Sequence, residues 1–195
     1  MDPLYLTLRT LTSPIAAITT SSGGRRNGLV VNSAQRASLV PTFMRVSMYI
    51  SKTNLTHDLI WDSGVFGMHL LRADQWDVVR ALGVRSGRDG DKFASLALRI
   101  GQTGCPLLQD CLVALECRVA NTMDAGAATF FLGDVVAAES GTEGDVMTSD
   151  RFRKGLPDDL RVQYEANLVR AQEELARIAQ TVDRARNWPG PTTRP

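Results

Sequence analysis

The chain has 195 residues, of which 44% are apolar and 22% are charged, as in ordinary globular domains. This composition excludes a disordered or fibrous chain. The 22 Lys and Arg residues balance 21 Asp and Glu residues to a net charge of +1, so nothing in the charge favours nucleic acid or an anionic membrane as a partner.

Segments rich in β-branched and apolar residues alternate with turn signals along the first 140 residues. The segment 21–28, SSGGRRNG, contains an Asn-Gly pair and predicts a hairpin turn, and residues 35–42 predict a loop. Several strands at short spacing, with few long helices, predict a closed or partly closed antiparallel barrel. The predicted strands are 4–20 with a break near Pro14, 29–34, 43–50, 65–71, 111–120 and 128–138.

Three segments have the pattern of helices. Residues 51–64 predict a loop that enters a short helix ending at Gly64, and residues 73–84 predict a second helix. A glycine-rich charged loop, SGRDGDKFAS, follows the second helix and is of the kind that often carries function. Pro157 and the two acids after it predict the start of a long helix that runs to about residue 186.

The long C-terminal helix has a narrow apolar seam, because Leu168, Leu175 and Val182 are seven residues apart. Two interpretations remain open: the helix packs on its own barrel, or it crosses to a second subunit. We predict two parts of the chain, a barrel domain over 1–150 and a C-terminal helix with a loose tail over 151–195.

Location and cysteine chemistry follow from simple counts. No apolar run approaches the ~20 residues that a membrane helix needs, and Asp2 and Arg9 do not suit a signal peptide, so we expect a cytoplasmic protein without membrane contact.

The three cysteines, Cys105, Cys111 and Cys117, are odd in number and match no common zinc spacing. We predict buried structural thiols and no metal site.

Two polar clusters interrupt apolar strands and suggest a ligand site. Asn32 and Ser33 follow Val30 and Val31, where they could meet the polar edge of a flat heterocycle. The second cluster, at 51–57, offers hydroxyls, an amide, one lysine and main-chain N–H groups before a helix, which is what a phosphate monoester requires. The alternative is a polar turn that only caps a helix.

The order of five motifs resembles that of the flavin reductase-like family of FMN-binding split barrels. The motifs are NGLVVNSAQRASLVP, ISKTNLTHDLI, SGRDGDKFA, GCPLLQDCLVALECRV and FFLGDVVAAE, and the similarity covers roughly residues 10–140. It implies a mainly β (α+β) fold, a six-stranded antiparallel Greek-key split barrel with peripheral helices that is usually a homodimer. It also implies FMN, less often FAD, as the flavin, and NADH or NADPH as the hydride donor. Many members supply reduced flavin to a separate monooxygenase.

The resemblance also implies site residues. Val30 to Ser33 would lie along the isoalloxazine, with Ser38 and Pro41 shaping the loop beside it, and the rare lysines would lie near the phosphate. No catalytic acid or base is implied, because hydride transfer requires none. The full set of expected flavin contacts is Val30, Val31, Asn32, Ser33, Ser38, Pro41, Ser51, Lys52, Thr53, Asn54, Thr56, His57, Lys92 and Phe93.

One departure from the family pattern keeps other functions open. Many relatives carry Asp-His, often beside the nicotinamide, where this chain has Ala127 and Ala128. The first alternative is therefore a flavoprotein that holds FMN tightly for electron transfer or substrate oxidation. The second is a non-enzymatic FMN-binding or dimeric interaction protein.

Four further side chains carry structural expectations. His57 is interpreted either as a hydrogen-bonded residue at a helix start or as a direct flavin contact. His69 lies in an apolar strand and predicts a hydrogen-bonded core histidine. Glu116 and Arg118 fall on one face of a predicted strand, which predicts a surface ion pair.

Overall fold

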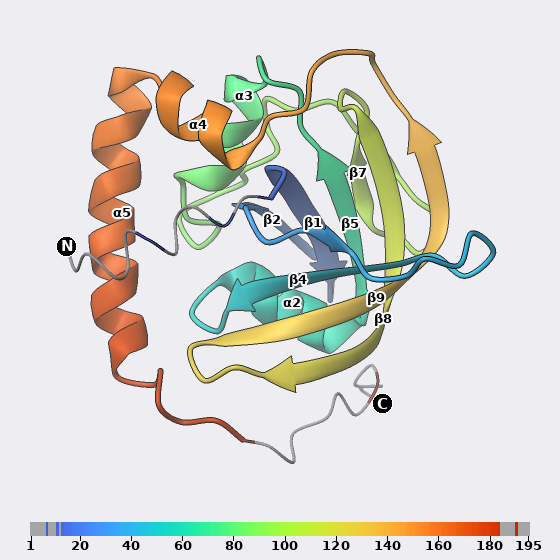
Figure 1. Cartoon of the computed structure of the whole chain (residues 1–195), viewed down its shortest axis with the longest axis horizontal. Coiled ribbons are helices and arrows are strands. Elements are labelled where there is room, and N and C mark those ends of the chain that lie inside the picture. Colours follow the sequence, from blue (N-terminus) through green and yellow to red (C-terminus); the bar gives the residue numbers. More distant parts are fainter. Residues whose placement is uncertain (1–6, 8–10, 12, 184–189, 191–195) are drawn as a thin grey trace.

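Seven strands form one antiparallel sheet, in the order β2-β1-β5-β8-β9-β4-β3, and β6 and β7 form a second, two-stranded sheet (Figure 1). This computed structural model describes residues 7, 11, 13–183 and 190. In chain order the elements are β1 Ala16–Ser22, β2 Arg25–Val31, β3 Gln35–Arg36, β4 Arg45–Ser51, α2 Leu55–Ser63, β5 Val65–Leu70, α3 Trp76–Val78, the π-helix η1 Val79–Gly83, β6 Leu98–Ile100, β7 Pro106–Leu108, β8 Val113–Asp124, β9 Ala128–Ser140, α4 Ser149–Gly155 and α5 Asp158–Ala176.

The large sheet curls into a split barrel, and a serine bridges its gap. The strands β2 and β4 are not paired, but the Ser33 hydroxyl just after β2 donates to the Tyr49 carbonyl of β4 at 3.1 Å. The Tyr49 N–H donates back to the same hydroxyl oxygen at 3.2 Å. The predicted fold class is confirmed. The sheet has seven strands where six were predicted, because Gln35 and Arg36, within the predicted loop 35–42, pair with β4.

Two large hydrophobic clusters build most of the core, beside a small third one of Val65, Cys105 and Leu107. The cluster inside the barrel contains the fully buried side chains of Ile18, Met48, Phe66 and Phe131. The second cluster lies where the sheet meets the helices, and it holds Leu71, Leu82, Met147 and Leu160. The first cluster fixes the barrel, and the second fixes where α4 and the start of α5 attach to it.

The turn between β1 and β2 lies earlier than the Asn-Gly pair suggested. Gly23 and Gly24 make the turn with φ values of 56° and 77°, in the left-handed region that glycine adopts without strain. Asn27 and Gly28 lie within β2 and pair with β1. The hairpin turn predicted within 21–28 is therefore confirmed, and the returning strand begins at Arg25, earlier than the predicted 29–34.

The predicted short helices are confirmed with adjusted bounds. The helix α2 ends at Gly64, whose φ is 68° and whose N–H donates to the Ile60 carbonyl. The predicted helix 73–84 is a short α3 that continues as the π-helix η1. The sequence analysis did not predict α4, although Thr148 caps its first turn by accepting a hydrogen bond from the Arg151 N–H. No helix in the described ranges is both long and apolar enough to cross a membrane.

The long helix α5 lies along one side of the molecule, drawn in orange in Figure 1, and packs on its own chain. Its first turn buries Leu160, and Tyr164 packs edge-on against Phe152 of α4 at 5.5 Å between ring centroids. The helix ends at Ala176, so the predicted end near residue 186 was wrong. Beyond Ala176 the Ile178 N–H donates to the Leu175 carbonyl three residues back, which tightens the chain into turns.

Of the remaining structural expectations, those for the cysteines and His69 are confirmed and that for Glu116 is wrong. All three cysteines are buried free thiols, and burial raises the pKa of Cys105 to about 12. His69 is fully buried and hydrogen-bonded as predicted, to the Ala17 carbonyl and the Leu108 N–H. Glu116 is buried rather than at the surface, so the predicted surface pair with Arg118 was wrong.

Glu116 is buried because the loop after β6 covers its strand face. Its carboxylate accepts hydrogen bonds from the main-chain N–H groups of Gln102 and Thr103 and from the Thr103 hydroxyl. A Cβ atom at Gly101 would lie 2.5 Å from the carboxylate, so glycine permits this approach. Glu116 therefore holds the 101–103 loop against the barrel.

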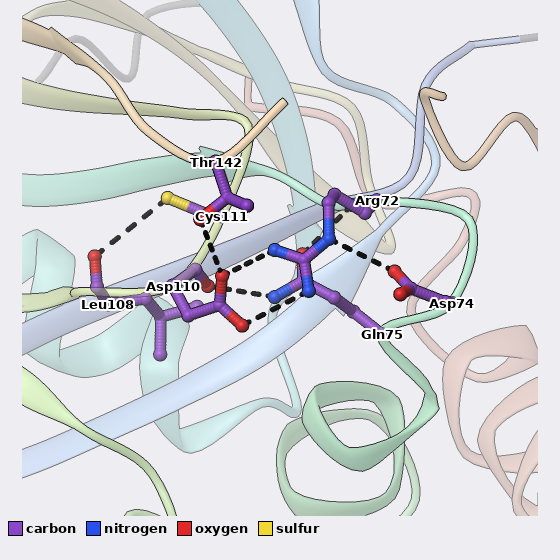
Figure 2. A network of polar contacts seen from close by, with 7 residues as sticks. All are labelled: Arg72, Asp74, Gln75, Leu108, Asp110, Cys111 and Thr142. Atoms are coloured by element: carbon purple, nitrogen blue, oxygen red, sulfur yellow. Dashed lines mark hydrogen bonds and ion pairs between the residues drawn. The ribbon is translucent and has the colours of Figure 1, made fainter. Parts of the chain in front are cut away.

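A second polar network ties three loops together (Figure 2). The Arg72 guanidinium, just after β5, binds both carboxylate oxygens of Asp110 and also Asp74. Asp110 in turn accepts from the Thr142 hydroxyl at 3.1 Å, and its carbonyl accepts from Gln75 Nε2 at 2.8 Å. The hydrogen bond from Arg72 is the largest cause that holds the pKa of Asp110 below its ordinary value. The network joins the ends of β5, β7 and β9.

Candidate functional site

A cleft of about 610 Å³ lies between the barrel and α5. Four segments line it: the end of β2 with the residues after it, the segment that leads from β4 into α2, the loop after η1, and one face of α5. Of the predicted site residues, nine line this cleft: Val30, Val31, Asn32, Ser33, Ser51, Thr53, Asn54, Thr56 and Lys92.

The C-terminal end of β2 and the residue after it line two neighbouring cavities. Val30, Val31 and Asn32 line the cleft and also a neighbouring cavity of about 420 Å³. The second cavity has a mixed lining, with Ile15, Val79 and Phe152 beside Ser149 and Arg153. A ligand laid along β2 would therefore have access to both cavities.

The segment after β4 presents hydrogen-bond donors to the cleft. The helix α2 begins after Asn54, and no side-chain hydrogen bond caps its first turn within the described part of the chain. The His57 N–H donates to the Asn54 carbonyl at 3.0 Å, so the Leu55 and Thr56 N–H groups are the ones available to an anion, and both residues line the cleft. The Thr56 hydroxyl oxygen is held in place by Asn27 Nδ2, which donates to it at 3.1 Å.

The glycine-rich loop after η1 brings arginines to the same end of the cleft. Arg85 and Arg88 both line it, and Arg88 Nη1 donates to the Thr53 carbonyl at 3.1 Å. Arg26 of β2 anchors the far end of the loop through a 2.7 Å ion pair with Asp91. Two guanidinium groups thus flank the donor-rich segment.

Lys92 is buried at the wall of the cleft and joins β2 to η1. Its ammonium donates to the Gly28 carbonyl at 2.7 Å and to the Leu82 carbonyl at 2.6 Å. Burial, with a smaller contribution from the charge of Arg85, lowers the pKa of Lys92 to about 8. Because β2 is an edge strand, Lys92 satisfies a carbonyl that has no neighbouring strand to bind it.

Lys52 faces away from the cleft lining. Its Nζ forms a 2.7 Å ion pair with Asp124, whose carboxylate is 4% exposed. Asp124 Oδ1 also accepts from the Gly126 N–H at 2.8 Å. Burial raises the pKa of Asp124, but the hydrogen bonds from Lys52, Gly126 and Asp183 outweigh it and hold the pKa below its ordinary value.

Four other predicted site residues are also absent from the cleft lining. His57 is buried and makes hydrogen bonds to Thr129 at 2.8 Å and Asp58 at 3.0 Å. Phe93 lies in the hydrophobic core beside η1. Ser38 and Pro41 lie in the loop before β4, where the Ser38 hydroxyl accepts from the Val40 N–H.

Lining residues from two parts of the chain were not predicted from the sequence. Arg85 and Arg88 stand in or beside the loop that was marked as functional, and the arginine pair itself was the available signal. The second group comes from α5, where Tyr164, Asn167, Leu168, Arg170, Ala171 and Glu174 line the cleft. No local signal marks these residues, because only the packing of α5 on the barrel turns that face toward the cleft.

Comparison with known proteins agrees with the geometry. Residues 8–155 match the model of the flavin reductase like domain. The chain is 36% identical over 143 residues to the high molecular weight rubredoxin of Moorella thermoacetica, which covers 72% of this chain and 62% of that protein. It is 29% identical over 133 residues to a ferric-chelate reductase (NAD(P)H) of Archaeoglobus fulgidus, across 67% of this chain and 78% of that protein.

A solved structure shares the fold. The NADH:FAD oxidoreductase of Streptomyces globisporus superposes with a TM-score of 0.68 at 23% sequence identity, covering 76% of this chain and 90% of that one. The split barrel is therefore common to both proteins. The helix α5 begins after the last residue of the matched domain.

Proposed function

Since the chain belongs to the flavin reductase-like family, we propose that it is an oxidoreductase that binds FMN in the cleft and transfers hydride from NADH or NADPH to flavin. One observation carries the proposal: the strand end at Val30–Ser33 and the donor-rich segment 51–56 line the same cleft, although neither is near the other in sequence. They are the two parts that a flavin mononucleotide would need, one for its ring and one for its phosphate.

The donor set fits this cofactor. A phosphate monoester is a dianion that prefers main-chain N–H groups, hydroxyls and guanidinium groups. The open first turn of α2, the Thr53 and Thr56 hydroxyls, and Arg85 and Arg88 provide all three kinds. We assign the phosphate charge to Arg85 and Arg88 instead of Lys52, because both arginines line the cleft, whereas Lys52 does not and is paired with the buried Asp124.

The chain's own residues would bind and orient the reactants. The main chain of Val30 and Val31 and the Asn32 side chain would direct hydrogen bonds at the polar edge of the ring. Lys92, held by two carbonyls, would keep β2 and η1 at a fixed separation along the cleft. When bound, flavin supplies the hydride acceptor, and no residue of this chain needs to act as an acid or base.

A second function is favoured by one observation. Ala127 and Ala128 stand where many relatives carry Asp-His, and here the Ala127 carbonyl accepts from the Lys52 N–H at 3.0 Å. The site thus lacks an imidazole at that position for the nicotinamide. The alternative is a flavoprotein that keeps FMN bound for electron transfer or for oxidation of an organic substrate.

One anaerobic experiment separates these functions. The purified full chain is mixed with FMN and then with NADH or NADPH, and flavin absorbance is followed. Bleaching of excess FMN over many turnovers supports the reductase. Retention of FMN through gel filtration, without oxidation of either nucleotide, supports the alternative. A protein that binds no flavin would refute both and leave a non-enzymatic interaction protein.

We further propose that the protein is a cytoplasmic homodimer that supplies reduced flavin to a separate monooxygenase. The loop between β3 and β4 supports self-association, because Leu39 is 83% exposed and Val40, Phe43 and Met44 are about half exposed. Light scattering would give the mass of a dimer, and Phe43→Asp would shift it toward the monomer. A monomer at all concentrations would contradict the dimer.

A further inference from the structure

The helix α5 forms the outer wall of the cleft although it lies beyond the matched family domain. Six residues on one face of the helix, at positions 164, 167, 168, 170, 171 and 174, line the cleft. The rest of the flavin-binding surface comes from the barrel and its loops. The outer wall therefore lies outside the part of the chain that the family model describes, and it can alter which flavin fits.

A hydrogen bond closes the gap between α5 and the arginine-bearing loop. Asn167 Nδ2 donates to the Val84 carbonyl at 2.8 Å, directly before Arg85. The N-terminal half of α5 is fixed as well, by buried Leu160 and by an ion pair between Asp159 and Arg80. A ligand that binds at Arg85 therefore cannot pass between the loop and the helix at Asn167 without breaking this bond.

Charges on α5 favour one phosphate and oppose a second. Arg170 Nη2 donates to Asn167 Oδ1 at 2.7 Å, which holds the guanidinium on the cleft face of the helix. One turn further on, Glu174 places a carboxylate on the same lining. A phosphate that passed beyond Arg170 would approach this carboxylate and be repelled by it.

We propose that α5 makes the cleft selective for a flavin with a single terminal phosphate, FMN, over FAD. In this proposal, which rests on the proposed flavin function, Arg170 contacts the phosphate of FMN. The bridge from Asn167 to Val84 and the carboxylate of Glu174 exclude the adenylate half of FAD.

The test is a fluorescence titration of the full chain with riboflavin, FMN and FAD. Wild type should bind FMN at least tenfold more tightly than either other flavin. Arg170→Ala should weaken FMN binding about tenfold and change riboflavin binding less than twofold. Asn167→Ala and Glu174→Gln should each tighten FAD binding several-fold.

Matched controls come from the same helix and from the residue that directly follows it. Arg177→Ala and Glu173→Gln change exposed residues outside the cleft lining and should leave all three affinities unchanged. Equal binding of FMN and FAD by wild type, or equal shifts of both flavins in the three cleft variants, would overturn this inference alone. Failure to bind any flavin would refute the proposed function and this inference together.

Discussion

Lys52 and Asp124 form a 2.7 Å ion pair that links the segment after β4 to the tip of the β8–β9 hairpin. Because removal of one partner leaves a buried charge unpaired, Lys52→Ala should lower the free energy of unfolding by about 2 kcal/mol. Urea unfolding at pH 7 measures this loss. In a double-mutant cycle with Asp124→Asn, the double variant should lose less than the sum of the single losses.

The same pair predicts an acid-sensitive contribution to stability. The folded pKa of Asp124 lies below its ordinary 3.8, so the stabilisation is complete above that pH and is lost as the pH falls through the lowered pKa. Stability of Asp124→Asn should therefore depend less steeply on pH below 4 than that of wild type. If the stabilities of Asp124→Asn and wild type fell in parallel below pH 4, another carboxyl would dominate the acid sensitivity.

Arg88→Ala should weaken FMN binding roughly 10- to 100-fold, because a charge-assisted contact with the phosphate is worth roughly 1.5–3 kcal/mol. Riboflavin, which lacks the phosphate, should bind this variant and wild type alike. Arg151→Ala is the matched control, since Arg151 pairs with Asp145 and does not line the cleft. An equal loss for riboflavin would mean that the variant disturbs the cleft as a whole.

Glu116→Gln should cost about 1–3 kcal/mol of unfolding free energy, because the buried carboxylate accepts from two main-chain N–H groups and one hydroxyl of the 102–103 segment. Thermal and urea unfolding would measure the loss. Glu143→Gln, at an exposed loop position, should have no effect. FMN affinity should stay unchanged in both variants, since Glu116 does not line the cleft.

Because His69 is buried, the free energy of unfolding should fall as the pH is lowered from neutral to mildly acidic values. Burial, the main cause, lowers its pKa from 6.5 to about 4, so below pH 6.5 the unfolded chain takes up a proton that the folded chain does not. The free energy of unfolding should fall by about 3 kcal/mol between pH 7 and pH 4 from this group alone. Urea unfolding across this range should give a flatter pH profile for His69→Gln, and identical profiles would contradict the assignment.

The strands and the polar residues at their ends could be predicted because each depends on the pattern of residues within its own segment. The segments 43–50 and 65–71 alternate or are uniformly apolar between turn residues, and they became β4 Arg45–Ser51 and β5 Val65–Leu70. Likewise, polar residues at 32–33 and 51–56 interrupt apolar runs, and all of them except Lys52 line the cleft.

Distant contacts explain what the sequence could not predict. Glu116 is buried only because the 101–103 loop folds over its strand, and Lys52 points away from the cleft because Asp124 lies 72 positions further along the chain. The cleft face of α5 is set by Leu160 and Asn167, whose contacts lie in other elements. A helix seam shows which residues are apolar, but not which cavity they face.

The glycine turn between β1 and β2 offers a position for a spectroscopic probe. The space around the turn is open, since a Cβ atom at Gly23 or Gly24 would have nothing within 4 Å, so a short tag inserted between them should be tolerated if both glycines are kept for their positive φ angles. Because the three native thiols are buried, a cysteine carried by that tag would react selectively with a maleimide dye. The dye would lie beside Arg25 and Arg26, which donate hydrogen bonds to the Gly87 carbonyl and the Asp91 carboxylate of the glycine-rich loop. Its fluorescence would therefore report movements of that loop.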